Sequence, residues 1–201
     1  MRPSFGQAVI GSFLLPFRPD GGPMKFILAA IFALSLRTFA QDQPAPKHVD
    51  IPIIEPRPDD VGSIDGMIHA WYDIVTVPKG QTPDWGRDHT LYIKDIRFVE
   101  LREHQGKPAA DIVSHQEYAD ASSSIAETGF SEREIHRVTQ RFGNIVHVWS
   151  TYESRRTADG PVIARGINSI ELFWDGKRWW IANAVWQNET KESPIPKEYL
   201  P

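Results

Sequence analysis

Two adjoining hairpin patterns in the C-terminal half constrain the fold of this chain more than any other feature. The segments 131–157 and 162–189 each alternate between polar and apolar residues on both sides of a short turn, Gly143-Asn144 in the first and Asp175-Gly176 in the second. Turns of this composition between alternating segments are typical of β-hairpins. The C-terminal half is therefore expected to form a meander of four antiparallel strands.

A helical pattern precedes the hairpins. Apolar residues recur every three or four positions from Val61 to Val75, and Pro78 ends the pattern. This spacing predicts an amphipathic helix that buries one face. A weaker pattern of the same kind predicts a second helix over 85–92.

A short strand and one further helix are expected between these helices and the meander. Residues 97–103 alternate as a strand does. Ser114 and Glu117 have the spacing of a capping box at the start of a helix that Gly129 would end. This order of elements predicts an α+β fold, with a curved antiparallel sheet wrapped around the N-terminal helices.

Several of these segments resemble one known superfamily. They are the helix that carries AWYD, the hairpin GFSEREIHRVTQRFGNIVHVWSTYESRR and the hairpin RGINSIELFWDGKRWWIANAVWQNE. Together they look like the nuclear transport factor 2-like superfamily, in particular its SnoaL-like bacterial exported members, over residues 59–190. The resemblance implies a cone-shaped, cystatin-like roll around an apolar pocket, and often a dimer formed through the outer face of the sheet. The superfamily includes steroid isomerases, dehydratases, polyketide cyclases and proteins without enzymatic activity, so the fold alone does not identify a reaction.

The resemblance also implies a role for the first predicted helix. In steroid isomerases of the superfamily, a tyrosine of this helix helps to form an oxyanion hole. Trp71 or Tyr72 would line the corresponding cavity here, although aromatic pairs on such helices are most often part of the core. The acidic partners of those isomerases have no clear match in this sequence, so the resemblance does not by itself imply isomerase chemistry.

The expected domain boundaries follow from composition. Residues 24–40 have the features of a cleaved signal peptide: Lys25, the apolar run FILAAIFALSL and the small residues around Ala40. Residues 1–23 are interrupted by Pro and Gly, so Met24 is expected to be the true start of translation. A Pro-rich linker over 41–58, the domain over 59–190 and a tail over 191–201 complete the organisation. The protein is expected to be exported to the periplasm or secreted, without stable membrane insertion after cleavage.

Composition argues against several classes of partner and cofactor. The net charge is −4 and no basic run occurs, which is not typical of a nucleic-acid-binding protein. The chain has no cysteine, and its seven histidines lack the spacings of common metal sites. No fingerprint of a nucleotide- or dinucleotide-binding loop occurs, so no cofactor is expected.

The second hairpin predicts a ligand-facing surface. A two-residue turn would pair Asn168 with Asn183 on an apolar face that also carries Trp179. A four-residue turn would shift the partners but keep the faces. Buried amides need hydrogen-bond partners. They would either satisfy each other and nearby backbone, or orient a small apolar molecule that carries polar groups.

The opposite face of this hairpin is expected to form a homodimer interface. It would carry an aromatic and charged set of the kind enriched at interfaces: Arg165, Glu171, Arg178, Trp180 and Trp186.

The first hairpin leaves two alternatives open, because alternation does not decide which face is inside. If one face is inside, His136 lies near Glu134 and Glu153 as a candidate general base, and Trp149 lines the pocket. If the other face is inside, His136 is a surface residue.

Three hypotheses on function follow. The leading one is an exported domain that binds a small molecule. The alternatives are a cofactor-free isomerase, dehydratase or cyclase with His136 and Glu134 as catalytic groups, and a dimeric interaction module without a functional pocket.

Overall fold

The computed structural model describes residues 48–104 and 106–201. The expected leader at 1–23, the signal peptide at 24–40 and the first part of the linker, 41–47, lie outside the described residues. The elements, in chain order, are α1 (Pro58–Val61), α2 (Ile64–Val75), α3 (Trp85–His89), β1 (Arg97–His104), β2 (Lys107–Ser114), α4 (His115–Ala121), η1 (Ser122–Ser124), α5 (Ile125–Thr128), β3 (Ser131–Phe142), β4 (Ile145–Arg155), β5 (Val162–Trp174), β6 (Trp179–Asn188) and η2 (Lys197–Tyr199).

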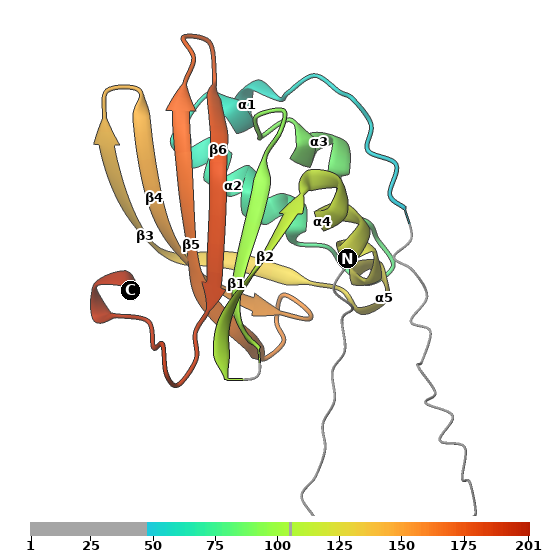
Figure 1. Cartoon of the computed structure of the whole chain (residues 1–201). Coiled ribbons are helices and arrows are strands. Elements are labelled where there is room, and N and C mark those ends of the chain that lie inside the picture. Colours follow the sequence, from blue (N-terminus) through green and yellow to red (C-terminus); the bar gives the residue numbers. More distant parts are fainter. Residues whose placement is uncertain (1–47, 105) are drawn as a thin grey trace, which may run out of the picture. The chain divides into compact units, whose positions relative to one another are not determined.

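The six strands form one curved sheet in the order β2-β1-β6-β5-β4-β3 (Figure 1). The predicted α+β class is confirmed. Neighbouring strands are antiparallel except β1 and β6, which run parallel, so the sheet is mixed. Strand β2 was not predicted, because its sequence KPAADIVS has no regular alternation and starts next to a proline.

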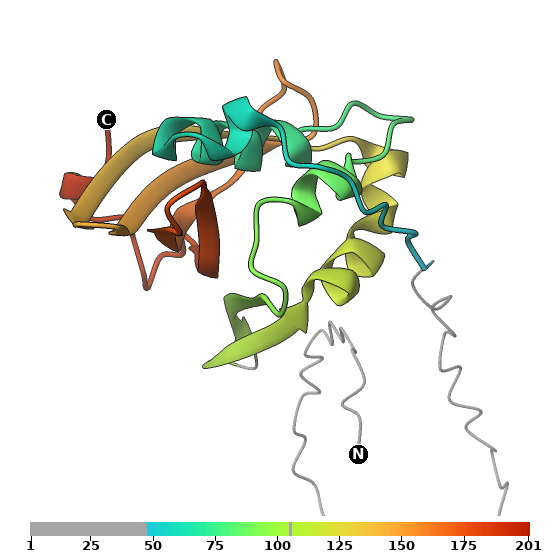
Figure 2. The ribbon, with the colours of Figure 1, turned by 90° about the horizontal axis from the view of Figure 1, so that it is seen from above.

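The helices lie against the concave face of the sheet (Figure 2). Helix α2 contributes Met67, Ile68, Trp71 and Tyr72 to the core, and the sheet contributes the buried aliphatic residues opposite them: Val146, Val148, Ile170, Leu172 and Ile181. None of the helices in the described ranges is long and apolar enough to cross a membrane.

The predicted first helix is divided in two. Helix α1 ends at Val61, and Ser63 begins α2 by accepting a hydrogen bond from the backbone N–H of Gly66 (2.9 Å). The predicted capping box is confirmed, since the side chains of Ser114 and Glu117 each bond the other residue's backbone N–H. The helix that it starts ends at Ala121, and a 3₁₀ turn and α5 follow before Gly129.

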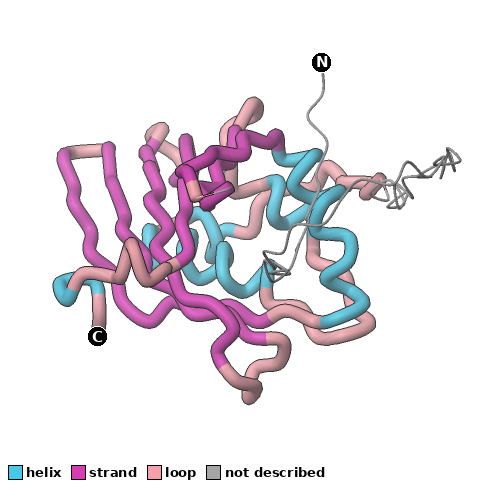
Figure 3. The backbone as a smooth tube through the Cα atoms, turned by 60° about the horizontal axis from the view of Figure 1, so that its bottom comes forward, coloured by secondary structure: helices cyan, strands magenta, loops and turns pink. Residues whose placement is uncertain are grey.

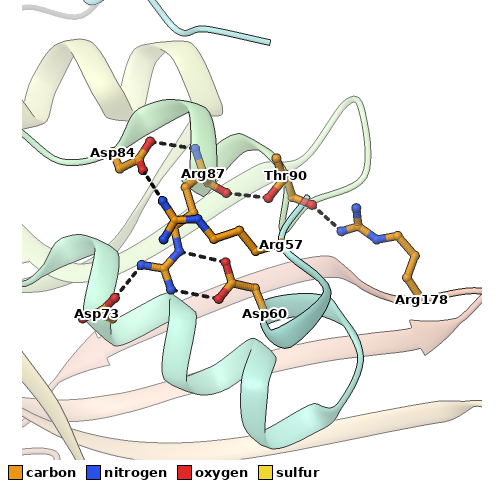
Figure 4. Close-up of polar contacts among 7 residues, drawn as sticks. All are labelled: Arg57, Asp60, Asp73, Asp84, Arg87, Thr90 and Arg178. Atoms are coloured by element: carbon orange, nitrogen blue, oxygen red, sulfur yellow. Dashed lines mark hydrogen bonds and ion pairs between the residues drawn. The ribbon is translucent and has the colours of Figure 1, made fainter. Parts of the chain in front are cut away.

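Arg87 joins the three N-terminal helices (Figure 4). Its guanidinium donates two hydrogen bonds to Asp60 of α1 (2.8 Å each) and one to Asp73 of α2 (2.5 Å). The hydrogen bonds from Arg87 hold the pKa of Asp60 below its usual value. In addition, Asp84 caps α3 at the backbone N–H of Arg87. This cluster fixes α3 against α1 and α2, and its charges are paired with one another.

The predicted turn of the first hairpin is confirmed. Phe142 pairs with Ile145 across Gly143-Asn144. A β-bulge between Glu134 and His136 then shifts the register. Beyond the bulge, residues of β3 face the side opposite to that expected from strict alternation.

The second hairpin has the four-residue loop, so the register expected for a two-residue turn is wrong. The carboxylate of Asp175 accepts the backbone N–H groups of Lys177 and Arg178, which makes a longer loop, and Trp174 pairs with Trp179. A bulge between Glu171 and Leu172 adds a further shift. As a result, Asn168 pairs with Trp186, and Asn183 pairs with Glu171.

The chain after β6 returns across the outer face of the sheet (Figure 3). The hydroxyl of Thr151 donates to the backbone oxygen of Tyr199 (2.6 Å), and the rings of Trp149 and Tyr199 lie 5.7 Å apart. Ile195 of the same segment is buried. The segment 191–201, expected as a tail, thus covers part of β4.

A candidate site inside the curved sheet

The inner face of the sheet changes from apolar to polar along its strands. Near the hairpin turns, β4 and β5 present Val146, Val148, Ile170 and Leu172, all fully buried. Toward the other end, the same faces present polar or small residues: Ser150, Tyr152, Ser154, Asn168 and Gly166. An apolar interior with a few polar groups at one end is the usual composition of a small-molecule site.

Glu132 lies at the polar end, on the edge strand β3. It pairs with Ser154, whose hydroxyl donates to its carboxylate (2.7 Å). On its other side, the hydroxyl of Thr76 donates to the Glu132 carbonyl oxygen (2.9 Å) and accepts from the Glu132 N–H (3.1 Å). The end of α2 therefore holds the backbone of Glu132 at an edge that no further strand covers.

The surroundings of Glu132 favour its protonated form. Among the described residues, Ser154 is its one hydrogen-bond donor, and no cation pairs with it. Burial raises the pKa of Glu132 to about 7. A carboxyl with this pKa exists in both charge states near neutral pH, so it can donate as well as accept a hydrogen bond.

Three tyrosines accompany this carboxyl. Burial raises the pKa of Tyr72, Tyr118 and Tyr152 well above the usual value for a phenol, and the negative charge of Glu132 adds to the effect on each. Each hydroxyl therefore keeps its proton. We refer to Glu132, Tyr72, Tyr118 and Tyr152 as the interior cluster.

Gly166 makes room for one of these phenols. A Cβ at this position would lie 2.4 Å from the Tyr152 hydroxyl oxygen and 2.3 Å from the carbonyl oxygen of Gln187. Without a side chain on Gly166, the Tyr152 hydroxyl reaches Asn188, to which it donates (2.9 Å). A larger residue at 166 would displace Tyr152 from the cluster.

A chain of hydrogen bonds leads from the interior to the rim. The side-chain amide of Asn168 donates to the Tyr72 hydroxyl (3.0 Å), which lies 2.7 Å from the Ser150 hydroxyl. Ser150 donates to the carboxylate of Glu134 (2.5 Å), and Arg137 pairs with that carboxylate. Tyr72 thus accepts from Asn168 and donates to Ser150. Its hydroxyl is satisfied within the protein, whereas Glu132 retains unused hydrogen-bonding capacity.

The structure separates the sequence-predicted site residues between the two faces. Five of them lie inside: Trp71, Tyr72, Glu134, Asn168 and Trp179. The other three, expected inside or left open, lie on the outer face: His136, Trp149 and Asn183. The bulge at Ile135 places His136 and Glu134 on opposite faces, so the predicted imidazole–carboxylate pair does not form. Glu153 also lies outside, where Arg133 and Arg155 lower its pKa.

The predicted pairing of Asn168 with Asn183 is wrong for the same kind of reason. The bulge in the second hairpin turns Asn183 to the exposed surface, whereas Asn168 remains buried. It also turns Trp186 inward against Phe98 and Tyr118, so Trp186 is not on the outer face expected for a dimer interface.

Sequence reasoning missed Glu132, Tyr118 and Tyr152. The sequence held one signal for Tyr152 and, indirectly, for Glu132. In β4, the alternate residues Ser150, Tyr152 and Ser154 continue the apolar series Val146, Val148 on the same face. That series predicts a polar patch inside the sheet, and hence a partner strand that brings polar groups to it. The bulge that turns Glu132 toward it has no evident sequence signal.

No family model matches the sequence, and no curated protein matches it. Among solved structures, the chain is similar to a nuclear transport factor 2-like protein of unknown function from Silicibacter pomeroyi, with 12% identity over 64% of this chain and 94% of that chain and a TM-score of 0.45. It is similar to a proposed ketosteroid isomerase from Parabacteroides distasonis, with 11% identity, coverage of 65% and 91%, and a TM-score of 0.44. It is also similar to a nuclear transport factor 2-like protein of unknown function from Methylobacillus flagellatus, with 14% identity, coverage of 64% and 95%, and a TM-score of 0.41.

At these identities and TM-scores, the likeness does not assign the chain to a superfamily, and the resemblance to the nuclear transport factor 2-like superfamily stays a prediction. In the part of the chain that the structure describes, no group of three or more His, Cys, Asp or Glu residues is placed to hold a metal ion.

Proposed function

We propose that the domain binds a small, largely apolar molecule inside the curved sheet, and that Glu132 contacts a polar group of that molecule. The observation that carries the proposal is a half-buried carboxyl with a pKa of about 7 and one hydrogen-bond donor, beside an apolar interior. The apolar part of the ligand would contact the aliphatic and aromatic residues of the interior. Its carbonyl or hydroxyl group would take the free hydrogen-bonding positions of Glu132.

The test is mass spectrometry of small molecules that co-purify with the full chain. Three proteins are compared: the wild type, Glu132→Ala, and the control Glu103→Ala, which changes an exposed residue of β1. We expect one molecule to be retained by the wild type and the control and lost from Glu132→Ala. If all three proteins carry the same molecules, or none, the proposal fails.

A second candidate function is proton-transfer catalysis of the isomerase, dehydratase or cyclase type. The observation that favours it is again the pKa of Glu132, because a general acid or base works best when its pKa is near the operating pH. His136, the catalytic candidate from the sequence, lies on the other face, so this proposal does not use it.

Deuterium exchange separates catalysis from binding. The probe is 2-cyclohexenone in D2O, and loss of its α-proton signal is followed by NMR. A catalyst should accelerate the exchange, and Glu132→Gln should reduce that acceleration by at least about 100-fold, the contribution typical of a general base. Equal exchange with wild type and variant would exclude Glu132 as the base.

We also propose export and self-association. Residues 24–40 support export, and the N-terminal sequence of protein recovered from outside the cytoplasm would test it. The outer face supports a homodimer through Trp180, whose ring is covered by the Arg178 guanidinium at 3.7 Å, an aromatic and arginine pair of the kind enriched at interfaces. A monomer in sedimentation experiments at tens of micromolar, roughly where weak interfaces dissociate, would contradict the dimer.

A further inference from the structure

A depression lies at the end of the domain that carries the turns of the two hairpins. It has a volume of about 350 Å³ and is formed by three separate parts of the chain: the junction of α1 and α2, the first hairpin turn and the loop of the second hairpin (Figure 1). Its wall includes Ser63, Ile64, Arg141, Asn144, Trp174 and Trp179. The volume is at the lower end of the range of about 300–1,000 Å³ for small-molecule sites, so it suits a ligand with a single ring.

Arg141 lies on the wall of this depression and is open to solvent. It pairs with Val146 across the first hairpin, and Val146 is fully buried against the core, so Arg141 lies on the inner face of β3. Arg141 itself is exposed, near the end of a strand at the edge of the sheet. A ligand that enters the depression from solvent can therefore contact its guanidinium.

Two contacts fix the guanidinium of Arg141. Its Nε donates to the carbonyl oxygen of Gly143 in the turn (2.9 Å), and its central carbon lies 5.4 Å from the centre of the Trp179 ring, a cation–π distance. Its two terminal nitrogens make no hydrogen bond to any described residue. The N–H groups on these nitrogens are therefore available to a ligand.

No carboxylate pairs with Arg141 in the part of the chain that the structure describes. Arg137, four residues earlier on the same strand, differs in this respect, because it forms ion pairs with Glu134 (2.6 Å) and Asp65 (2.6 Å). Among the described residues that line the depression, none is acidic and Arg141 alone is charged. The depression thus carries one positive charge that its own wall does not balance.

The rest of the wall places an aromatic surface beside this charge. The rings of Trp174 and Trp179 lie 5.7 Å apart, and Ile64 of α2 adds an aliphatic side chain. Trp179 is 5% exposed, so its main role here is to support Arg141. Trp174 and Ile64 are half-buried, so both retain surface that a ligand can contact. Aromatic rings pack favourably against one another in offset or edge-to-face arrangements, which favours a ring in the ligand.

We propose that this depression binds a small aromatic carboxylate, with the carboxylate on the terminal nitrogens of Arg141 and the ring on Trp174. The fork of a guanidinium matches the two oxygens of a carboxylate, and such paired hydrogen bonds are among the strongest in proteins. The hydroxyl of Ser63 and the side-chain amide of Asn144 are further donors on the wall. The depression shares no lining residue with the interior cluster, so this proposal does not depend on Glu132.

The test uses the full chain with ¹⁵N-labelled tryptophan and follows the indole N–H resonance of Trp174 by NMR, with Trp174→Phe to assign it. Benzoate is the probe. Benzamide has nearly the same shape without the charge, and acetate has the charge without the ring. We expect a saturable shift with benzoate, and binding of benzamide and acetate that is weaker by about tenfold or more. The absence of a saturable shift with benzoate, or binding of either analogue within about tenfold of benzoate, overturns the proposal.

Two variants of exposed arginines locate the carboxylate. Arg141→Gln should weaken benzoate binding by about tenfold or more and leave benzamide binding unchanged. Arg156→Gln removes the same charge from an exposed arginine outside the depression that also lacks an ion pair with any described residue, and it should bind benzoate as the wild type does. Equal benzoate affinity for the two variants overturns the proposed position.

Glu132→Ala separates this site from the interior cluster. Because Glu132 does not line the depression, the variant should bind benzoate as the wild type does, even where it has lost a co-purifying molecule. Loss of benzoate binding in Glu132→Ala would place benzoate in the interior cluster and overturn the proposal.

Discussion

Asp88 is buried and Glu132 is half-buried, and their neighbours also give the two carboxyl groups different properties. Asp88 accepts two hydrogen bonds, from Tyr92 and His115, and thereby holds α3, the following loop and α4 together. Glu132 accepts one, from Ser154, and burial raises its pKa to about 7. The number of donors around a buried carboxyl thus distinguishes a structural group from one that is available for a ligand or a proton.

The largest expected effect is the loss of the Asp88 contacts. Asp88→Ala should lower the free energy of unfolding by about 3–5 kcal/mol, because it leaves both the Tyr92 hydroxyl and the His115 ring without a buried partner. Asp50→Ala, at an exposed position, should change it by less than about 0.5 kcal/mol. Urea unfolding measures both. A loss below about 1 kcal/mol for Asp88→Ala would show that Asp88 is not the structural carboxyl.

Asp88 stabilises the folded state, whereas the contribution of Glu132 to stability should be lost at high pH. Its pKa is about 7 in the folded protein, against an ordinary value of 4.5, so the folded state binds the proton more tightly. The contribution of Glu132 is fully present below pH 4.5 and is lost as the pH rises through 7. The loss is about 3 kcal/mol, since each tenfold change in proton affinity corresponds to about 1.4 kcal/mol.

Glu132→Gln should therefore remove this pH dependence. The variant is expected to gain stability relative to the wild type between pH 5 and pH 8, measured by urea unfolding at both values. Glu103→Gln, at an exposed position, should follow the wild type. If the difference between wild type and Glu132→Gln is the same at both pH values, Glu132 does not titrate as described.

A smaller difference in stability is expected between two variants that each remove one phenol hydroxyl, one beside Asp88 and one in the interior cluster. Tyr92 donates to the buried carboxylate of Asp88, whereas Tyr152 donates to the neutral amide of Asn188, an exposed residue. Tyr92→Phe should cost about 2 kcal/mol, because a bond to a charged group is lost, and Tyr152→Phe about 0.5–1 kcal/mol. Thermal unfolding of the two variants side by side measures the difference. Equal losses would remove the distinction between the two regions.

The class of the fold could be predicted because it rests on local patterns. The turn at Gly143-Asn144 fixed the first hairpin, and the capping box at Ser114 fixed the start of α4. The division of α1 from α2 could not be predicted, because the apolar spacing continues from Val61 to Ile64 across Gly62 and Ser63. Strand β2 could not be predicted, because it has no regular alternation.

The site could be predicted only in part, because the extra residue of a bulge turns every side chain beyond it to the opposite face of the sheet. The bulge in β3 brought Glu132 and Glu134 inside and left His136 outside. The bulge next to Leu172 exchanged the expected positions of Asn183 and Trp186. Tyr72 and Asn168 were predicted inside because they lie where no bulge intervenes, but their contact depends on the packing of α2 against β5.

Direct titration of Glu132 is the measurement that tests the central claim, an interior carboxyl that exchanges its proton near neutral pH. The side-chain carboxyl carbon of Glu132 is followed by ¹³C NMR in the full chain from pH 4 to pH 9, and Glu132→Gln assigns the resonance. The structure predicts a midpoint of about 7. A midpoint near 4.5, the ordinary value for a glutamate, would contradict the account.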